Sequence, residues 1–303
     1  AKADLCSEMV KEFPELQGTM GKYYAINDQE DQLIADIIEQ HYLPKFAGDK
    51  LPESLEACLL AIADRLDSLV GIFAINQKPT GDKDPFALRR SALGLLRILI
   101  EQSIPLDLNF LVRAAVDNHE ICSKLSTDDK TKLINECVDF CFERLKNYYA
   151  DQNISINLFY SVSKTNTNAP YDFHQRIIAV NNFLTLPEAP QLIMANKRVK
   201  NLLSKQDISD LPSLIDKTYL KEPAEIELND LLENKITLLS PLFNKKNYNN
   251  ILQSLADLQM PIDNFFNNVM VNADDVNLKN NRLLLLKNIQ ALFNRVADVS
   301  ELQ

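Results

Sequence analysis

Apolar residues in this chain recur at the spacing of an α-helix. The stretch from residue 275 to 297 is the clearest case, because its apolar side chains fall on one arc at about 100° per residue, the period of a helix. These residues are Leu278, Leu285, Leu286, Ile289, Leu292, Phe293 and Val296. Only 6 glycines occur among 303 residues, where average usage would give roughly 20. The pattern predicts an all-α fold and argues against a turn-rich β fold or a Gly-rich phosphate loop.

Proline and turn clusters interrupt the helical pattern and divide it into separate predicted helices. Asp84-Pro85 is a favourable N-cap and N1 pair for one of them. Residues 164–170 (KTNTNAP) form the clearest linker, because they are polar and end in proline. Residues 154–162 fit either a short helix or an irregular segment. The predicted helices cover residues 1–13, 28–42, 53–76, 84–103, 106–124, 127–150, 171–184, 188–205, 223–240, 246–258, 261–271 and 275–297.

Length and cysteine usage limit the class of protein. A chain of 303 residues has room for about two domains. It contains no run of 18 apolar residues and no basic-then-apolar leader, so we expect no membrane insertion and no membrane partner. The 5 cysteines are odd in number, lack a C-x-x-C spacing and lie among apolar neighbours. They indicate reduced core thiols in a cytoplasmic protein.

The net charge of −10 is unevenly distributed along the chain. Residues 1–70 carry 14 acidic and 6 basic side chains, a net charge of −8. Such a surface repels phosphate. Overall composition therefore argues against nucleic-acid binding, unless the basic residues are gathered on local faces.

Two predicted helices do carry basic faces. In residues 84–103, Arg90 and Arg97 share a stripe with Gly94, which permits close approach of another backbone, and Lys83 lies just before them. This stripe fits either an RNA contact or a helix–helix seam where arginines pair with acids. The stronger face lies in residues 188–205, opposite a core arc of Leu192, Ala195, Val199, Leu202 and Leu203. No acid occurs in residues 192–206, so an RNA contact is as plausible there as a merely solvated face. Its polar residues are Lys197, Arg198, Lys200, Asn201 and Lys205.

Arg282 lies in the middle of the apolar arc of residues 275–297. A guanidinium there is costly unless it is paired. We expect a structural ion pair with an acid such as Asp263 or Asp275, and the alternative is a contact with a partner or with RNA.

Catalytic patterns are nearly absent from the sequence. No Gly-rich phosphate loop, G-x-S-x-G elbow or His/Cys cluster occurs, so we predict no catalytic residues and no bound metal. Only 3 histidines are present, and His41 shares a helical stripe with isoleucines, which favours a core histidine over a metal ligand.

Several separated segments resemble the β subunit of bacterial glycyl-tRNA synthetase. They are KADLCSEMVKEFPELQGTMGKYYA near the start, PTGDKDPFALRRSALGLLRIL in residues 79–99, and FFNNVMV, NNRLLLL and RVADVSELQ near the end. They run in one consistent order from residue 2 to residue 303. Because the chain also begins without Met, we expect it to be the C-terminal part of a longer subunit.

The resemblance implies a fold, a function and partners. It implies a degenerate HD-type helical domain in 1–80, a connecting helical region in 81–170 and a helical anticodon-binding domain in 171–303. HD-type domains bind metals through His and Asp, but no His-Asp dipeptide occurs here, so we expect that chemistry to be lost although Asp64 and Asp67 lie in a similar helix. The implied function is to bind glycine tRNA for a glycine–tRNA ligase whose α subunit uses ATP and Mg, with no cofactor in this chain. The alternatives are an HD-type metal-dependent phosphohydrolase and a non-catalytic scaffold that binds only protein.

Overall fold

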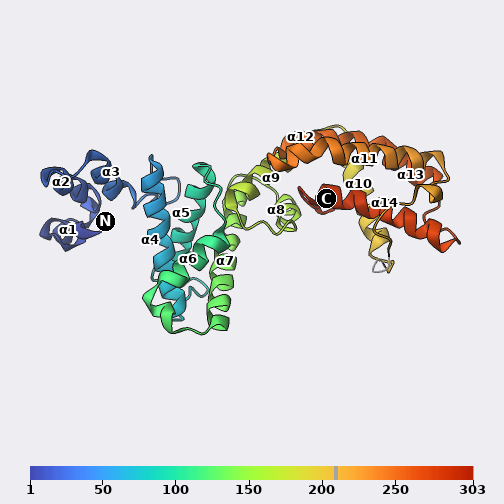
Figure 1. Ribbon diagram of the computed structural model, residues 1–303. Coiled ribbons are helices and arrows are strands. Elements are labelled where there is room, and N and C mark those ends of the chain that lie inside the picture. The colour runs from blue at the N-terminus through green and yellow to red at the C-terminus, as the bar shows by residue number, and fades with distance from the viewer. Residues whose placement is uncertain (208–210, 303) are drawn as a thin grey trace. The chain divides into compact units, whose positions relative to one another are not determined.

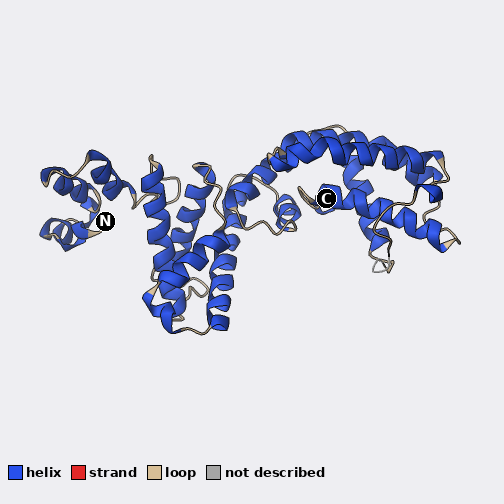
Figure 2. Ribbon diagram, viewed as in Figure 1, coloured by secondary structure: helices blue, strands red, loops and turns tan. Residues whose placement is uncertain are grey.

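A computed structural model describes residues 1–207 and 211–302, and all regular elements in these two ranges are helices (Figures 1 and 2). An isolated bridge between Thr80 and Lys83 is the one β-type pairing among them. The all-α prediction is therefore confirmed. Within the same ranges, no helix combines the length and the hydropathy that a membrane crossing requires.

The chain forms two compact units. The first consists of residues 1–148 and 168–171, and the second of residues 149–167 and 172–303. The predicted divisions near residues 80 and 170, and the HD-type assignment of residues 1–80, stay predictions.

Helices α1 to α7 build the first unit, apart from the last two residues of α7. Their bounds are α1 Glu8–Glu12, α2 Thr19–Asn27, α3 Gln32–Gln40, α4 Leu55–Ala74, α5 Leu88–Glu101, α6 Leu108–Asn118 and α7 Thr127–Ala150, with short 3₁₀ turns at Ala3–Cys6, Pro14–Leu16 and Glu120–Lys124. Helix α4 packs against α3, α5 and α6. It begins after Ser54, whose Oγ accepts a hydrogen bond from the backbone N–H of Ala57 at 3.1 Å, the usual N-cap arrangement.

Arg65 of α4 connects this helix to the chain that follows α3. Its guanidinium donates to the carbonyl oxygens of residues 41, 42, 43, 44 and 61, at 2.7 to 3.3 Å. Arg65 also lies against Gly94 of α5, where an added Cβ would come within 3.0 Å of its Nε. Gly94 therefore provides the close approach that its sequence position suggested, and the group that approaches it belongs to the protein.

Three predicted helices in this unit, those of residues 1–13, 28–42 and 84–103, begin at least four residues too early, and no predicted helix covers α2. The helix predicted for residues 1–13 is broken at Ser7, whose backbone is extended and whose Oγ accepts from the N–H of Val10 at 3.2 Å. The helix predicted from Asp84 begins at Leu88, after Ala87 in a left-handed conformation. Asp84 still satisfies the helix start, because its carboxylate accepts from the N–H groups of Leu88 and Arg89.

Helices α8 to α14 build the second unit, apart from the first two residues of α9. Their bounds are α8 Ile156–Ser163, α9 Pro170–Phe183, α10 Ala189–Leu203, α11 Pro223–Asn244, α12 Tyr248–Leu255, α13 Gln259–Asn268 and α14 Val276–Asn294, with 3₁₀ turns at Lys217–Tyr219, Ala256–Leu258 and Val299–Glu301. Helix α10 packs against α13, α14 and the last turn, and α11 packs against α12, α13 and α14. Residues 154–162 thus contain a helix, the first of the two alternatives.

A buried polar network fixes α9 against α12. Arg176 Nε donates to Asp172 Oδ2 at 2.8 Å, and the hydroxyl of Tyr248 donates to Asp172 Oδ1 at 2.8 Å. Arg176 also donates to the carbonyl oxygens of Arg295 and Val296. Because each charge has partners, the network offsets the cost of burying Asp172.

Candidate nucleic-acid interface

Helix α10 divides into an apolar face and a basic face. Leu192, Ala195, Val199 and Leu203 are buried, as predicted, whereas Leu202 is half-buried. The side chains of Lys197, Arg198, Asn201 and Lys205 are exposed on the other side. The helical period places Lys197, Arg198 and Asn201 on one face, and Lys205 lies just after the helix ends at Leu203.

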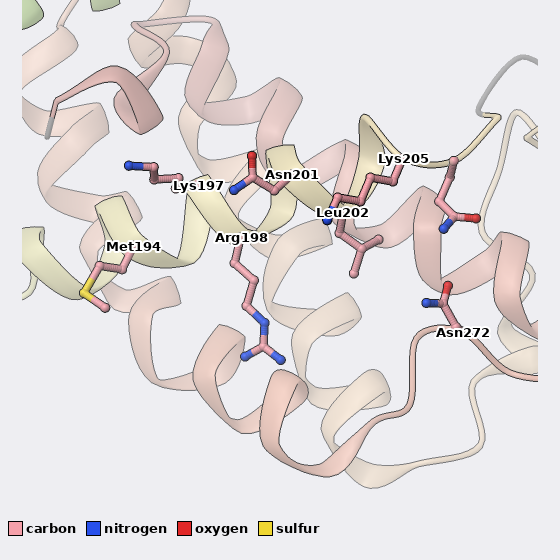
Figure 3. A pocket seen from close by; sticks show the side chains of 8 residues that line it. Met194, Lys197, Arg198, Asn201, Leu202, Lys205 and Asn272 are labelled. Atoms are coloured by element: carbon pink, nitrogen blue, oxygen red, sulfur yellow. The ribbon is translucent and has the colours of Figure 1, made fainter.

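The exposed face lines a hollow of about 620 Å³. Figure 3 shows its side chains along α10, with Met194 near one end and Asn272, from the segment between α13 and α14, near the other. Four of the five residues predicted for this face therefore lie together. Four lining residues were not predicted for this face: Leu202, which the sequence placed in the core arc, and Met194, Gln206 and Asn272. Met194 lies three residues before Lys197, so helical spacing could have found it, and Gln206 follows Lys205. Asn272 has no local signal, because only tertiary packing brings it to α10.

An aromatic ring holds Arg198 in place. Its guanidinium lies over the ring of Phe266 of α13, 4.1 Å from the ring centroid. A cation–π contact of this kind orders the side chain. In residues 1–207 and 211–302, no carboxylate forms an ion pair with Arg198 or Lys205. The hollow thus presents positive charge together with the amides of Asn201, Gln206 and Asn272.

Lys200 does not line this hollow. Its Nζ binds Asp298 at 2.9 Å and Glu301 at 2.6 Å, and the side chain is half-buried. Burial lowers the pKa of Lys200, but the hydrogen bonds with Glu301 and Asp298 outweigh this effect and raise it overall. Lys200 therefore anchors the last 3₁₀ turn to α10. The sequence window of residues 192–206 could not show this, because both acids lie about a hundred residues away.

The stripe predicted on α5 is divided between two environments. Arg97 pairs with Glu101 of the same helix at 2.8 Å and donates to the carbonyl oxygen of Asp49, in the loop before α4, at 2.9 Å. Arg97 therefore bonds within the protein, but not with an acid across a helix–helix seam. Arg90 and Lys83 are exposed. The three bases consequently do not act as one group.

Arg282 forms the predicted buried ion pair, but with a different partner. Its Nε donates to Glu225 Oε1 at 2.5 Å, and its Nη1 donates to the carbonyl of Met270 at 2.7 Å. Asp275 instead caps α14 by accepting from the N–H groups of Asn277 and Leu278. Asp263 accepts from Gln259. The partner comes from α11, 57 residues away, beyond the reach of a helical-spacing argument.

The first unit presents no grouped metal ligands among the described residues. His41 is fully buried, with Nδ1 2.8 Å from the carbonyl of Ile38. Burial lowers its pKa, which favours the neutral ring. Asp64 pairs with Lys2. In residues 1–207 and 211–302, no three His, Cys, Asp or Glu side chains are arranged to hold a metal ion. The absence of a metal stays a prediction.

The cysteine prediction needs one correction. Cys58, Cys122, Cys137 and Cys141 are buried, but Cys6, at the end of the first 3₁₀ turn, is exposed.

Comparison with known proteins identifies the family. Residues 1–164 match the family profile described as glycyl-tRNA synthetase beta subunit, and residues 192–299 match the DALR anticodon binding domain. The chain is 46% identical over 300 residues to the glycine–tRNA ligase beta subunit of Coxiella burnetii, covering 99% of this chain and 43% of that protein. The corresponding subunit of Marinobacter nauticus is 44% identical over 300 residues, with coverage of 99% and 42%. That of Colwellia psychrerythraea is 46% identical over 308 residues, with coverage of 100% and 43%.

The chain therefore spans less than half the length of these curated relatives. The first profile match contains the two resembling segments near the start of the chain, and the second contains FFNNVMV and NNRLLLL. The hollow beside α10 lies within the second match. The chain belongs to the glycyl-tRNA synthetase β-subunit family.

Proposed function

We propose that this chain is the tRNA-binding part of the β subunit of a heterotetrameric glycine–tRNA ligase. In this proposal it positions glycine tRNA for ATP-dependent glycylation at the active site of the α subunit. ATP and Mg would act at that subunit, and the complex would work in the cytoplasm. The observation that carries the proposal is the basic hollow of α10, within the region that matches an anticodon-binding domain.

The chemistry of the hollow suits an unpaired RNA segment. Exposed cations hold phosphates without regard to sequence, whereas side-chain amides can bond with the edges of unstacked bases. Lys197, Arg198 and Lys205 provide the first kind of group. Asn201, Gln206 and Asn272 provide the second kind.

The test compares two double variants in tRNA binding across a range of salt concentrations. Lys197→Gln/Lys205→Gln removes two positive charges from the hollow. Lys164→Gln/Lys221→Gln removes two from exposed positions that do not line it. We expect the first variant to bind tRNA more weakly and to lower the salt slope by roughly one to two units, since each single-stranded phosphate contact contributes about 0.7. The control variant Lys164→Gln/Lys221→Gln should lower the salt slope of tRNA binding by a smaller amount.

The variant Asn272→Ala tests base recognition separately from the electrostatic attraction of phosphates. It should leave the salt slope unchanged and reduce the preference for glycine tRNA over other tRNAs. Unchanged affinity and slope in Lys197→Gln/Lys205→Gln would refute the hollow as the RNA-binding face. A chain that binds no tRNA at any salt concentration would favour the protein-binding scaffold.

A further inference from the structure

An apolar groove of about 380 Å³ lies between α4 and α6 in the first unit, far in sequence from the basic hollow. Helix α4 lines it with residues spaced at i, i+3, i+4 and i+7, and α6 does the same with a stripe that begins at Leu111. The lining includes Leu59, Ile62, Ala63 and Leu66 of α4, and Ala114 and Ala115 of α6.

The shape of the groove suits a third helix. Two packed helices form its walls, and the alanines from both walls allow another backbone to approach closely. The stripe on α4 spans eight residues, from Leu59 to Leu66, which is about 10 Å or two helical turns. Leu59 remains 44% exposed, so apolar surface is available to a partner. Grooves of this kind bind the apolar face of an amphipathic helix.

The charge around the groove favours a basic partner. Asp67 lines it with a side chain that is 74% exposed, and its nearest base, His119, lies 3.7 Å away. On α6, Asp117 pairs with Lys130 at 3.5 Å, and Arg113 is exposed. Residues 1–70, the segment that contains α4, carry a net charge of −8, so this segment attracts positive charge.

We propose that the α4–α6 groove binds an amphipathic helix of a protein partner whose apolar face is flanked by Lys or Arg. This interaction is independent of the tRNA-binding proposal. A contact of two turns is much smaller than the roughly 800 Å² per partner of a stable interface, so it acts as one anchor in a larger contact. An isolated helical peptide therefore binds only in the micromolar range or more weakly.

The test uses a stapled model helix with Leu on one face and Lys on both flanks, labelled for fluorescence anisotropy and titrated with the full chain. A second peptide carries Glu in place of Lys. Ala114→Trp blocks the groove at an exposed position, Asp67→Lys reverses its charge, and Asp139→Lys makes the same charge change on the exposed side of α7. Circular dichroism confirms that each variant folds.

We expect the Lys peptide to bind the chain and Asp139→Lys about equally. Binding should fall at least fivefold with Asp67→Lys and by a larger factor with Ala114→Trp, and the Glu peptide should bind more weakly than the Lys peptide. No binding, or binding that Ala114→Trp leaves unchanged, would overturn the proposal. Equal binding of the two peptides would refute the claim that the partner helix needs Lys or Arg beside its apolar face. Self-association that Ala114→Trp abolishes would identify a second copy of the chain as the occupant, and sedimentation with phosphatidylcholine vesicles would identify a lipid surface.

Discussion

The buried pair of Arg282 and Glu225 makes a strong prediction about the second unit. Arg282 is 5% exposed and Glu225 is fully buried. If Arg282 is replaced by Ala, the Glu225 carboxylate loses its cation. Among the described residues, it keeps the hydrogen bond from the backbone N–H of Lys221 at 3.1 Å. The carbonyl of Met270 loses the Arg282 donor as well.

The expected cost follows from the uncompensated charge. Removing one partner of a buried ion pair typically destabilises a protein by about 3–5 kcal/mol. For a unit of about 150 residues, each kcal/mol lowers the melting temperature by about 2–4 °C. Arg282→Ala should therefore lower the melting temperature of the second unit by on the order of 10 °C.

The assay must resolve the two units, because a chain of two units need not unfold in one step. It contains no Trp, so intrinsic tryptophan fluorescence cannot report on either unit. Hydrogen exchange measured by mass spectrometry can, with peptides from α11 and α14 as the readout and peptides from α4 as the internal reference. Lys279→Ala on α14 is the matched control, with an expected change below about 0.5 kcal/mol.

A double variant distinguishes the unpaired charge from lost packing. Arg282→Met/Glu225→Leu removes both charges and keeps apolar volume, so it should lie within about 2 kcal/mol of the original chain, or be more stable. The reasoning would be refuted if Arg282→Ala cost less than about 1 kcal/mol. It would also fail if the double variant were as unstable as the single one.

Three further predictions concern acid stability, thiol reactivity and catalysis. Burial raises the pKa of Asp172, but hydrogen bonds from Arg176 and Tyr248 outweigh this and lower it. Its stabilising contribution is therefore present above the unfolded value of about 3.9 and lost as the pH falls through the folded value. Urea unfolding should show that the original chain loses its advantage over Asp172→Asn below about pH 4, and an advantage independent of pH would contradict this. With Ellman's reagent, exposed Cys6 should react promptly and the buried thiols only after unfolding, since burial raises the pKa of Cys141, for example, to about 12. The pure chain should show no glycine-dependent pyrophosphate exchange, and its detection would contradict the placement of the chemistry on the α subunit.

Elements whose signals are local could be predicted from the sequence. Helix α7 has both ends where its pattern placed them, at Thr127 and Ala150, and α14 begins one residue after the position expected. Side-chain oxygens that cap a helix act within three residues, so the sequence contains the whole interaction. Ser7 shows the limit of that argument, because the same capping chemistry broke a helix that the apolar spacing had predicted as continuous.

For features that depend on tertiary contacts, the sequence predicted the type of interaction but not the partner residue. The position of Arg282 required a partner, but the choice of Glu225 over Asp275 depends on how α11 packs against α14. Lys200 and Lys205 look equivalent in the sequence, yet of these two lysines it is Lys200 that pairs with two acids within residues 1–207 and 211–302. Asn272 lines the hollow because of the chain path after α13.

The placement of acids explains how an acidic chain can contain a basic hollow. The second unit has 17 acidic and 15 basic residues, a net charge of −2. Several of its acids are held by partners away from the hollow: Asp172 binds Arg176, Glu225 binds Arg282, and Asp298 binds Lys200. The two carboxylates that bind Lys200 lie against α10 but contact this lysine, so they do not pair with Lys205, which lies five residues further along the chain, just after the helix ends. The local electrostatic potential depends on this distribution more than on net charge, so net charge alone is a poor guide to where positive potential lies on this chain.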